Sequence, residues 1–343
     1  MEVKRILAGS RRRLICGASV GVLGAVVLVV IAGAAVGAPS RGDAKKPVRV
    51  AYLSFAVANS YDAPMLAAAR RVAKAQGASV TVFDAANDPK KQLAQLQTVS
   101  TSKQYNAIIV QPIFGPQLLS TVRQAIRNKI KVVNMDQILG TNPGTSKPPI
   151  KGMAGNVVFV QTQIGRKQGR LVVKACAARR ANPCRVGYLY SVKVSSLDTA
   201  IRKGFNAVTA GHNIRVETEG ETFYNPANAL KAAQTMLTAK PNLTLIVGAD
   251  QGATGAEQAL GGKRVTLIGY GGGAVGLKAV RSGRWYGTVM QRPATEGRLA
   301  MQCAIKAVRT GKGCGGIDVL KGLPNGGVVT KANAGKFKAE WPG

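Results

Sequence analysis

Aromatic rings, amides and single carboxylates recur in this 343-residue sequence directly after short runs rich in β-branched residues. Lys193 is the only lysine or arginine at these positions, which are therefore far less basic than the rest of the chain. Aromatic rings stack on sugar faces, while amides and carboxylates exchange hydrogen bonds with hydroxyl groups. The pattern suits a neutral polyol or sugar, and it covers residues 55–61, 111–114, 136–137, 191–199, 223–224, 249–251, 270–273 and Gln291.

The sequence offers too few histidines for a catalytic metal cluster or a choice of Ser-His-Asp triads, because His212 is the only one. Residues 271–276 do form a Gly-x-Gly-x-x-Gly turn, which is typical of dinucleotide-dependent oxidoreductases. That class also needs a strand ending in Asp or Glu about 20 residues later. The strand expected over 285–291 ends in Gln291 instead. We therefore expect no enzyme, no cofactor and no metal, and keep the oxidoreductase as a remote alternative.

β-branched runs alternate with amphipathic segments along most of the chain, which predicts parallel strands covered by helices on both faces. Strands are expected over 48–54, 79–84, 107–110, 131–136, 185–190, 215–219, 243–248, 265–270 and 285–291. Helices are expected over 64–76, 115–128, 163–178, 199–210, 227–239, 252–259 and 274–282, and after the cap at 87–89. This number of β-α units is too large for a single sheet. We therefore predict an α/β protein with two similar Rossmann-like lobes. Ligands of such sheets bind beyond the carboxyl ends of the strands, where the polar segments lie.

Several short motifs occur at these strand ends in a distinctive order. They are 59–62 (Asn-Ser-Tyr-Asp), 86–92 (Ala-Asn-Asp-Pro-Lys-Lys-Gln), 132–137 (Val-Val-Asn-Met-Asp-Gln), 199–205 (ending in Gly-Phe) and 288–293 (Thr-Val-Met-Gln-Arg-Pro). From Val48 to about Lys331 the chain thereby resembles the ribose-binding-protein type of solute-binding protein from sugar ABC transporters. The resemblance implies the type I periplasmic-binding-protein fold, with two lobes joined by three hinge crossings near 153–160, 291–293 and 318–326. It also implies that lobe closure buries a small ligand and that the closed form docks on a permease.

The resemblance further implies which residues bind the ligand. Asp136 matches a sugar-binding carboxylate, Tyr61 matches a stacking aromatic of the family's Asn-Pro-Phe-Phe motif, and Gln291 matches a polar contact. The complete expected set is Asn59, Tyr61, Asp136, Gln137, Thr199, Tyr224, Asp250, Tyr270 and Gln291.

Four positions depart from the family pattern. Gln137 and Thr199 stand where binders of pentoses and hexoses commonly carry arginines, Ala249 replaces an asparagine and Gly271 replaces an aspartate. Losing two guanidinium groups removes strong charge-assisted hydrogen bonds to hydroxyls. Asp250, directly after Ala249, and Asp198 are expected to compensate in part. The identity of the ligand stays open, and so does the alternative of a sensor component that feeds a receptor or kinase.

Residues 1–38 are expected to direct export. Residues 1–13 carry five basic side chains and residues 14–38 carry no charge, which is typical of a signal peptide. A run of that length also suffices to span a bilayer, so cleavage and anchoring are both open. We expect an exported protein of the periplasm or cell surface. Its other predicted parts are a linker 39–47, an N-terminal lobe 48–155 plus 292–320, and a C-terminal lobe 156–291 plus 321–343.

Four cysteines follow this segment, and an oxidising compartment favours their pairing. Four cysteines allow three sets of disulfides. The pairing between sequence neighbours joins Cys176 to Cys184 and Cys303 to Cys314, which would tie the end of each predicted helix to the loop after it.

The chain carries 48 lysines and arginines against 15 acidic residues, a formal net charge of +33. DNA-binding repressors that respond to sugars share the bilobal fold, but they need an N-terminal helix-turn-helix where this chain has the apolar run 14–38. The basic residues beyond 11–13 are dispersed, so we expect no specific nucleic-acid partner and place the charge on the exterior, toward an anionic surface. The expected partners are a sugar-like small molecule and an ABC permease, and the chain is expected to be a monomer.

Overall fold

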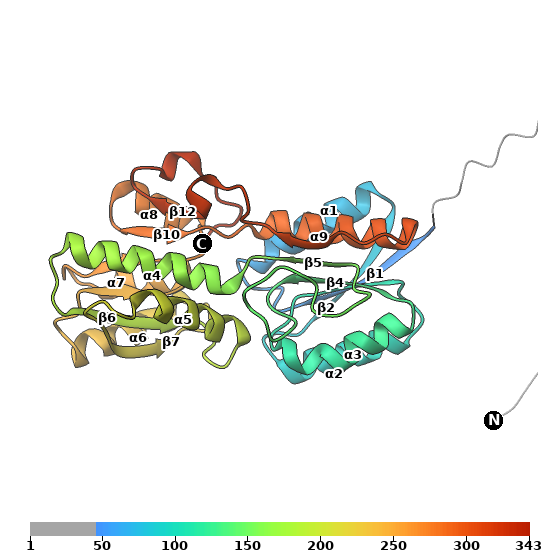
Figure 1. Ribbon diagram of the computed structural model, residues 1–343, viewed down its shortest axis with the longest axis horizontal. Coiled ribbons are helices and arrows are strands. Elements are labelled where there is room, and N and C mark those ends of the chain that lie inside the picture. Colours follow the sequence, from blue (N-terminus) through green and yellow to red (C-terminus); the bar gives the residue numbers. More distant parts are fainter. Residues whose placement is uncertain (1–45) are drawn as a thin grey trace, which may run out of the picture. The chain divides into compact units, whose positions relative to one another are not determined.

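Two six-stranded sheets form the framework of the protein (Figure 1). The computed structural model describes residues 46–343, so the export segment expected over 1–38 lies outside the described residues. Within the described part, no helix is long and apolar enough to cross a membrane. The α/β fold with two sheets of largely parallel strands is as predicted.

The first sheet has the order β11-β5-β4-β3-β1-β2 and is parallel throughout. Its strands are β1 (Val48–Ser54), β2 (Ala78–Asp84), β3 (Ala107–Val110), β4 (Lys131–Asp136), β5 (Gly155–Val158) and β11 (Gly315–Asp318). Helices α1 (Asp62–Ala75) and α9 (Pro293–Thr310) cover one face, and α2 (Pro89–Thr101) and α3 (Gly115–Arg127) cover the other (Figure 1). Burial on both faces explains why β3 is an unbroken apolar run, Ala-Ile-Ile-Val.

The second sheet has the order β12-β10-β9-β8-β6-β7, and only the β10–β12 pair is antiparallel. Its strands are β6 (Cys184–Tyr190), β7 (Ile214–Glu221), β8 (Leu245–Val247), β9 (Thr266–Ile268), β10 (Gly287–Val289) and β12 (Val328–Thr330). Helices α4 (Gln161–Ala178) and α5 (Ser196–Thr209) pack on one face. Helices α6 (Pro226–Ala239), α7 (Asp250–Ala259) and α8 (Ala274–Ser282) pack on the other.

The chain passes between the two sheets three times, after β5, after β10 and after β11. These passages lie within or next to the expected hinge regions. The first comes after Val158, because β5 pairs with β4 and β11 and so belongs to the first sheet. The boundary expected at 155/156 therefore lies a few residues before the point where the chain leaves that sheet.

Side-chain caps explain where several helices begin. The carboxylate of Asp88 accepts hydrogen bonds from the backbone N–H groups of Lys90 and Lys91, and Pro89 occupies the first helical position of α2. Asn225 caps α6 in the same way. These caps begin each helix shortly after a strand, so the carboxyl ends of the strands stay open to a ligand.

One disulfide links neighbouring elements within each lobe. Cys176 near the end of α4 is bonded to Cys184 at the start of β6, and Cys303 of α9 is bonded to Cys314 just before β11. The Cα atoms of each pair are 5.7 Å apart. Of the three possible sets, the structure therefore has the one between sequence neighbours.

Helices α4 and α5 approach so closely that glycine is required at their contact. A Cβ atom at Gly165 would overlap the carbonyl oxygen of Ile201, and one at Gly204 would overlap that of Thr162. We expect Gly165→Ala to lower the free energy of unfolding by about 2 to 3 kcal/mol, because the obstacle is backbone that must shift. Gly335→Ala is the control, since nothing lies within 4 Å of a Cβ there. It is expected to change stability by less than about 0.5 kcal/mol in urea unfolding. Equal midpoints for the two variants would contradict this close packing.

Candidate functional site

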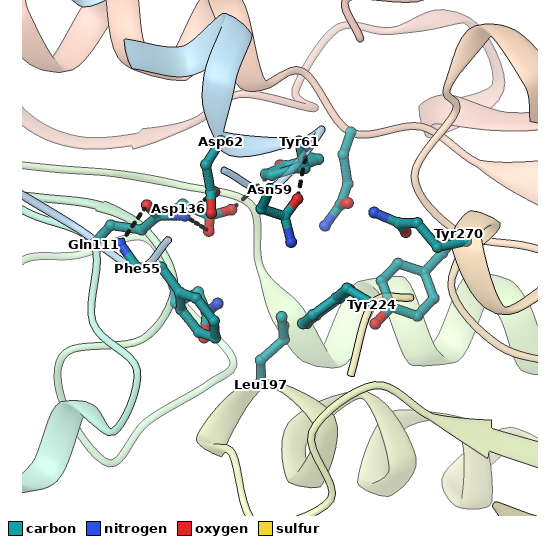
Figure 2. A pocket seen from close by; sticks show the side chains of 12 residues that line it. Phe55, Asn59, Tyr61, Asp62, Gln111, Asp136, Leu197, Tyr224 and Tyr270 are labelled. Atoms are coloured by element: carbon teal, nitrogen blue, oxygen red, sulfur yellow. Dashed lines mark hydrogen bonds between the residues drawn. The ribbon is translucent and has the colours of Figure 1, made fainter. Parts of the chain in front are cut away.

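A pocket lies at the carboxyl ends of strands from both sheets and leaves about 390 Å³ between its atoms. The first sheet contributes residues after β1, after β3 and at the end of β4, and the second contributes residues after β7, β8, β9 and β10. Its lining residues are Phe55, Asn59, Tyr61, Asp62, Gln111, Asp136, Gln137, Leu197, Tyr224, Gln251, Tyr270 and Gln291 (Figure 2).

Most of the expected ligand-binding residues meet at this pocket. Its lining includes Asn59, Tyr61, Asp136, Gln137, Tyr224, Tyr270 and Gln291. Thr199 and Asp250 lie outside it. Thr199 is on the exposed face of α5. Asp250 is fully buried, where its carboxylate accepts hydrogen bonds from Thr288 Oγ1 at 2.7 Å and from the backbone N–H of Gly273 at 2.9 Å.

Five lining residues were not among those expected, namely Phe55, Asp62, Gln111, Leu197 and Gln251. Four of them fall inside the polar strand-end segments, so position along the chain was a usable signal. Asp62 had a different signal. It occupies the last place of the motif 59–62, where the resembling family carries a second aromatic, and a carboxylate at that place is a visible departure.

A shared amide links the two carboxylates of the pocket. Gln111 Nε2 donates to Asp62 Oδ1 at 2.6 Å and to Asp136 Oδ2 at 2.9 Å, and Figure 2 shows all three side chains converging. Gln111 is itself held by the backbone N–H of Phe55, which donates to its Oε1 at 3.1 Å. The hydroxyl of Tyr61 donates to Asp136 Oδ1 at 3.3 Å. Asp136 therefore sits at the centre of the network.

Burial makes ionisation of these acids unfavourable. It raises the pKa of Asp62 to about 8 and that of Asp136 to about 6, and the hydrogen bonds from Gln111 counteract part of each change. Glu296 of α9 lies beside Asp136, and burial together with the charge of Asp136 raises its pKa well above the usual value. None of the twelve lining residues of this described pocket is lysine, arginine or histidine.

Aromatic side chains form much of the remaining lining. The rings of Phe55 and Tyr224 meet edge to face with centroids 6.3 Å apart, so a pair from different lobes borders the pocket. The hydroxyl of Tyr270 lies 3.2 Å from Ser191 Oγ. Tyr61 contacts the ring of Trp341 edge to face at 5.4 Å.

Two pocket residues have backbone conformations that non-glycine residues rarely adopt. Asp136 has a φ of 66° and Tyr224 a φ of 53°, both in the left-handed region. Such strain concentrates at functional sites, where the surrounding structure holds it in place. The carboxylate and the ring are thus aimed by the backbone as well as by their contacts.

The glycine-rich turn before α8 is filled by the protein's own groups. The N–H of Gly273 donates to Asp250, and the N–H groups of Ala274 and Val275 donate to the carbonyl oxygens of Trp341 and Pro342. A dinucleotide phosphate needs those same donors at a helix N-terminus. The protein's own oxygen atoms therefore occupy the donors of this turn. This removes the main support for the hypothesis of a dinucleotide-dependent oxidoreductase.

Comparison with known proteins identifies the family. A family model described as a periplasmic binding protein domain matches residues 50–313. This chain belongs to that family. Its named relatives include the ribose import binding proteins of Haemophilus influenzae (25% identical, covering 70% of this chain and 79% of that protein) and Escherichia coli (24%, 70% and 78%). Both of these ribose import binding proteins are solute-binding proteins and not enzymes.

Solved structures of other solute-binding proteins share the fold of this chain. One is an ABC transporter solute-binding protein from Mycobacterium smegmatis with bound glycerol (TM-score 0.72, 23% identity, covering 87% of this chain and 99% of that one). Another is a solute-binding protein from Bacillus halodurans with bound myo-inositol (TM-score 0.69, 17% identity, 88% and 100%). At these identities the likeness concerns the fold.

Proposed function

We propose that this periplasmic binding protein captures a sugar or related polyol and delivers it to an ABC permease. The observation that carries the proposal is the pocket, because its walls come from both sheets and combine hydrogen-bonding groups with aromatic rings. Carboxylates and amides suit hydroxyl groups, and rings suit the apolar faces of sugars. The ribose, allose and myo-inositol named for relatives and structural neighbours support the same ligand class.

The three chain passages between the sheets make a hinge the natural means of capture. A ligand that contacts both lobes stabilises the arrangement in which the lobes are closed, because only that arrangement provides all its contacts. In this proposal the permease recognises the closed form. Residues 1–38 serve as the export segment, and the exported chain acts as a monomer.

Tyr224 offers a direct test of this ligand site. We expect a thermal-shift screen against sugars and polyols to raise the melting temperature with at least one of them, because binding to the folded state stabilises it. Tyr224→Ala is expected to weaken binding of that ligand by about tenfold or more, since an aromatic contact contributes about 0.5 to 1.5 kcal/mol in addition to the effect of its buried area. Isothermal titration calorimetry measures the change.

The neighbouring Phe223→Ala is the matched control, because Phe223 is 59% exposed and does not line the pocket. It should leave the affinity unchanged. An equal loss in both variants would contradict the assigned pocket. A complete absence of shifts across the screen would contradict the proposed function.

A further inference from the structure

The wall of the pocket formed by the first lobe holds an excess of buried hydrogen-bond acceptors. Asp62 and Asp136 are 4% and 2% exposed, and they share the single amide group of Gln111. Behind them Glu296 is fully buried, and neither of its carboxylate oxygens has a hydrogen-bond partner among the described residues. Apart from any protons that the acids themselves hold, the side-chain donors to these three carboxyl groups are the amide of Gln111 and the hydroxyl of Tyr61 among the described residues.

A separate acceptor on the same pocket also lacks a donor. The side-chain oxygen of Gln137 is buried without a hydrogen-bond partner within residues 46–343, although Gln137 lines the pocket and is 5% exposed. Buried polar atoms are normally satisfied, so an unpartnered oxygen in a residue that lines the pocket favours a ligand that brings a hydrogen-bond donor. Because Gln137 carries an amide and not a carboxylate, its unpartnered oxygen is an observation independent of the acidic cluster.

The described part of the protein provides no cation for these acids. The salt bridges of residues 46–343 involve the acids Glu217, Glu219, Glu257 and Glu340, and none involves Asp62, Asp136 or Glu296. Buried carboxylates without a counter-charge must either hold protons or meet a cation. No group of three or more possible metal ligands occurs in the described region, so the geometry does not favour a metal ion.

We propose that the ligand of this pocket carries a basic nitrogen, as in an amino sugar or an amino polyol, and that its ammonium group binds between Asp62 and Asp136. This inference rests on the proposed function and narrows its ligand class. An ammonium group has three donors and a positive charge, so it satisfies both carboxylates at once. The rings of Tyr61, Tyr224 and Tyr270 also suit a cation, because their faces carry negative potential. Gln137, in place of a family arginine, leaves that space without a competing positive charge.

The proposal requires binding to be linked to protons. Asp62 and Asp136 act on each other, and the other titratable groups coupled to this pair are Tyr61 just before α1, Tyr52 of β1, Tyr224 after β7 and Glu296 of α9, with Asp84 at the end of β2 acting on Asp62. All of these groups are carboxyls or phenols, and among the described residues Arg70 is the cation that acts on Tyr52. Because burial raises the pKa of Asp62 to about 8, this group holds a proton at pH 7 until a cation arrives. An ammonium ligand should therefore release protons when it binds.

Matched ligand pairs provide the test. Glucosamine with glucose, galactosamine with galactose, and glucamine with glucitol each exchange one hydroxyl for an amine. N-acetylglucosamine keeps the nitrogen without its charge. We expect the amine of at least one pair to bind about tenfold more tightly than its hydroxyl partner at pH 7 in titration calorimetry, and N-acetylation to remove the gain. Titration in two buffers of different ionisation enthalpy should reveal proton release for the amine alone.

A substitution tests whether the preference for the amine ligand depends on the acidic side chains of the pocket. Asp136→Asn retains an acceptor for Gln111 and should reduce the preference for the amine to about twofold or less. Asp88→Asn removes the same charge at the exposed cap of α2, outside the pocket, and should keep the preference. Equal or tighter binding of the hydroxyl partners would overturn the inference and leave the proposed function intact. Stabilisation by Ca²⁺ without any by amines would overturn it as well. Failure of every sugar, polyol and amine would contradict the proposed function itself.

Discussion

Asp62→Asn is expected to make the ligand-free protein more stable at pH 8 and to flatten the pH dependence of its stability. Burial raises the pKa of Asp62 to about 8 from its ordinary value of 3.8, so the folded state holds a proton that the unfolded chain has lost. The stability that depends on this proton is complete below about pH 4 and is lost as the pH rises through 8. Over that interval, at about 1.4 kcal/mol per pH unit, the loss is on the order of 5 kcal/mol. Asparagine carries no charge at any of these pH values and still accepts the hydrogen bond from Gln111.

Urea unfolding at pH 5 and pH 8 measures this effect. Asp136, Asp198 and Asp250, whose pKa values burial raises to about 6, act in the same direction and are present in both proteins. The difference between wild type and Asp62→Asn therefore reports Asp62 together with its coupling to Asp136. Asp88→Asn, at the exposed cap, should follow the wild-type profile. A variant that loses as much stability as wild type between pH 5 and pH 8 would show that the Asp62 carboxyl does not hold a proton in the folded protein.

Trp341→Ala is expected to lower the free energy of unfolding by about 3 to 5 kcal/mol, the usual cost of removing a buried aromatic side chain. Trp341 is 4% exposed, and its Nε1 donates to the carbonyl oxygen of Gly271 at 2.9 Å. Its ring fills the space over the glycine turn, where a Cβ at Gly271 would lie 2.6 Å from it. On its other side the ring contacts Tyr61 of the first lobe.

The contact with Tyr61 extends this effect to the ligand site. Tyr61 lines the pocket and donates to Asp136, so loss of its neighbour should weaken ligand binding as well as stability. Trp341→Phe keeps a ring against Tyr61 but loses the Nε1 hydrogen bond, at a net cost of about 0.5 to 1.5 kcal/mol. Chemical unfolding and calorimetry should therefore rank the phenylalanine variant between wild type and alanine. Equal stability of Trp341→Ala and wild type would contradict the buried contact.

Much of the framework follows from local patterns in the sequence. The run Ala107–Val110 and the cap Asp88-Pro89 each specify their element through short-range chemistry, and both occur as predicted. β5 was not among the predicted strands, because a four-residue strand near a hinge carries no periodic signal of its own. Its pairing with β11, a segment more than 150 residues later, assigns it to the first sheet.

The residues of the candidate site were likewise predictable only in part. Positions just after strands were predictable, because the carboxyl ends of parallel strands gather at one edge of a sheet. Asp250 also follows a strand, yet it turns inward to Thr288 and Gly273, and such long-range partners leave no mark in the local sequence. Asp62 joins the pocket through Gln111, a side chain 49 residues away.

The sequence alone determined the α/β class, the two lobes, the resemblance to sugar-binding proteins of ABC transporters and the strand ends that line the pocket. Each of these depends on residue type and short-range periodicity, which the chain displays directly. Only the tertiary structure decided which cysteines pair and that two acids share one amide without a counter-charge from residues 46–343. Those features depend on distances between residues far apart in the chain and on burial, which sets the charge state of a carboxyl group and arises only when the lobes have folded.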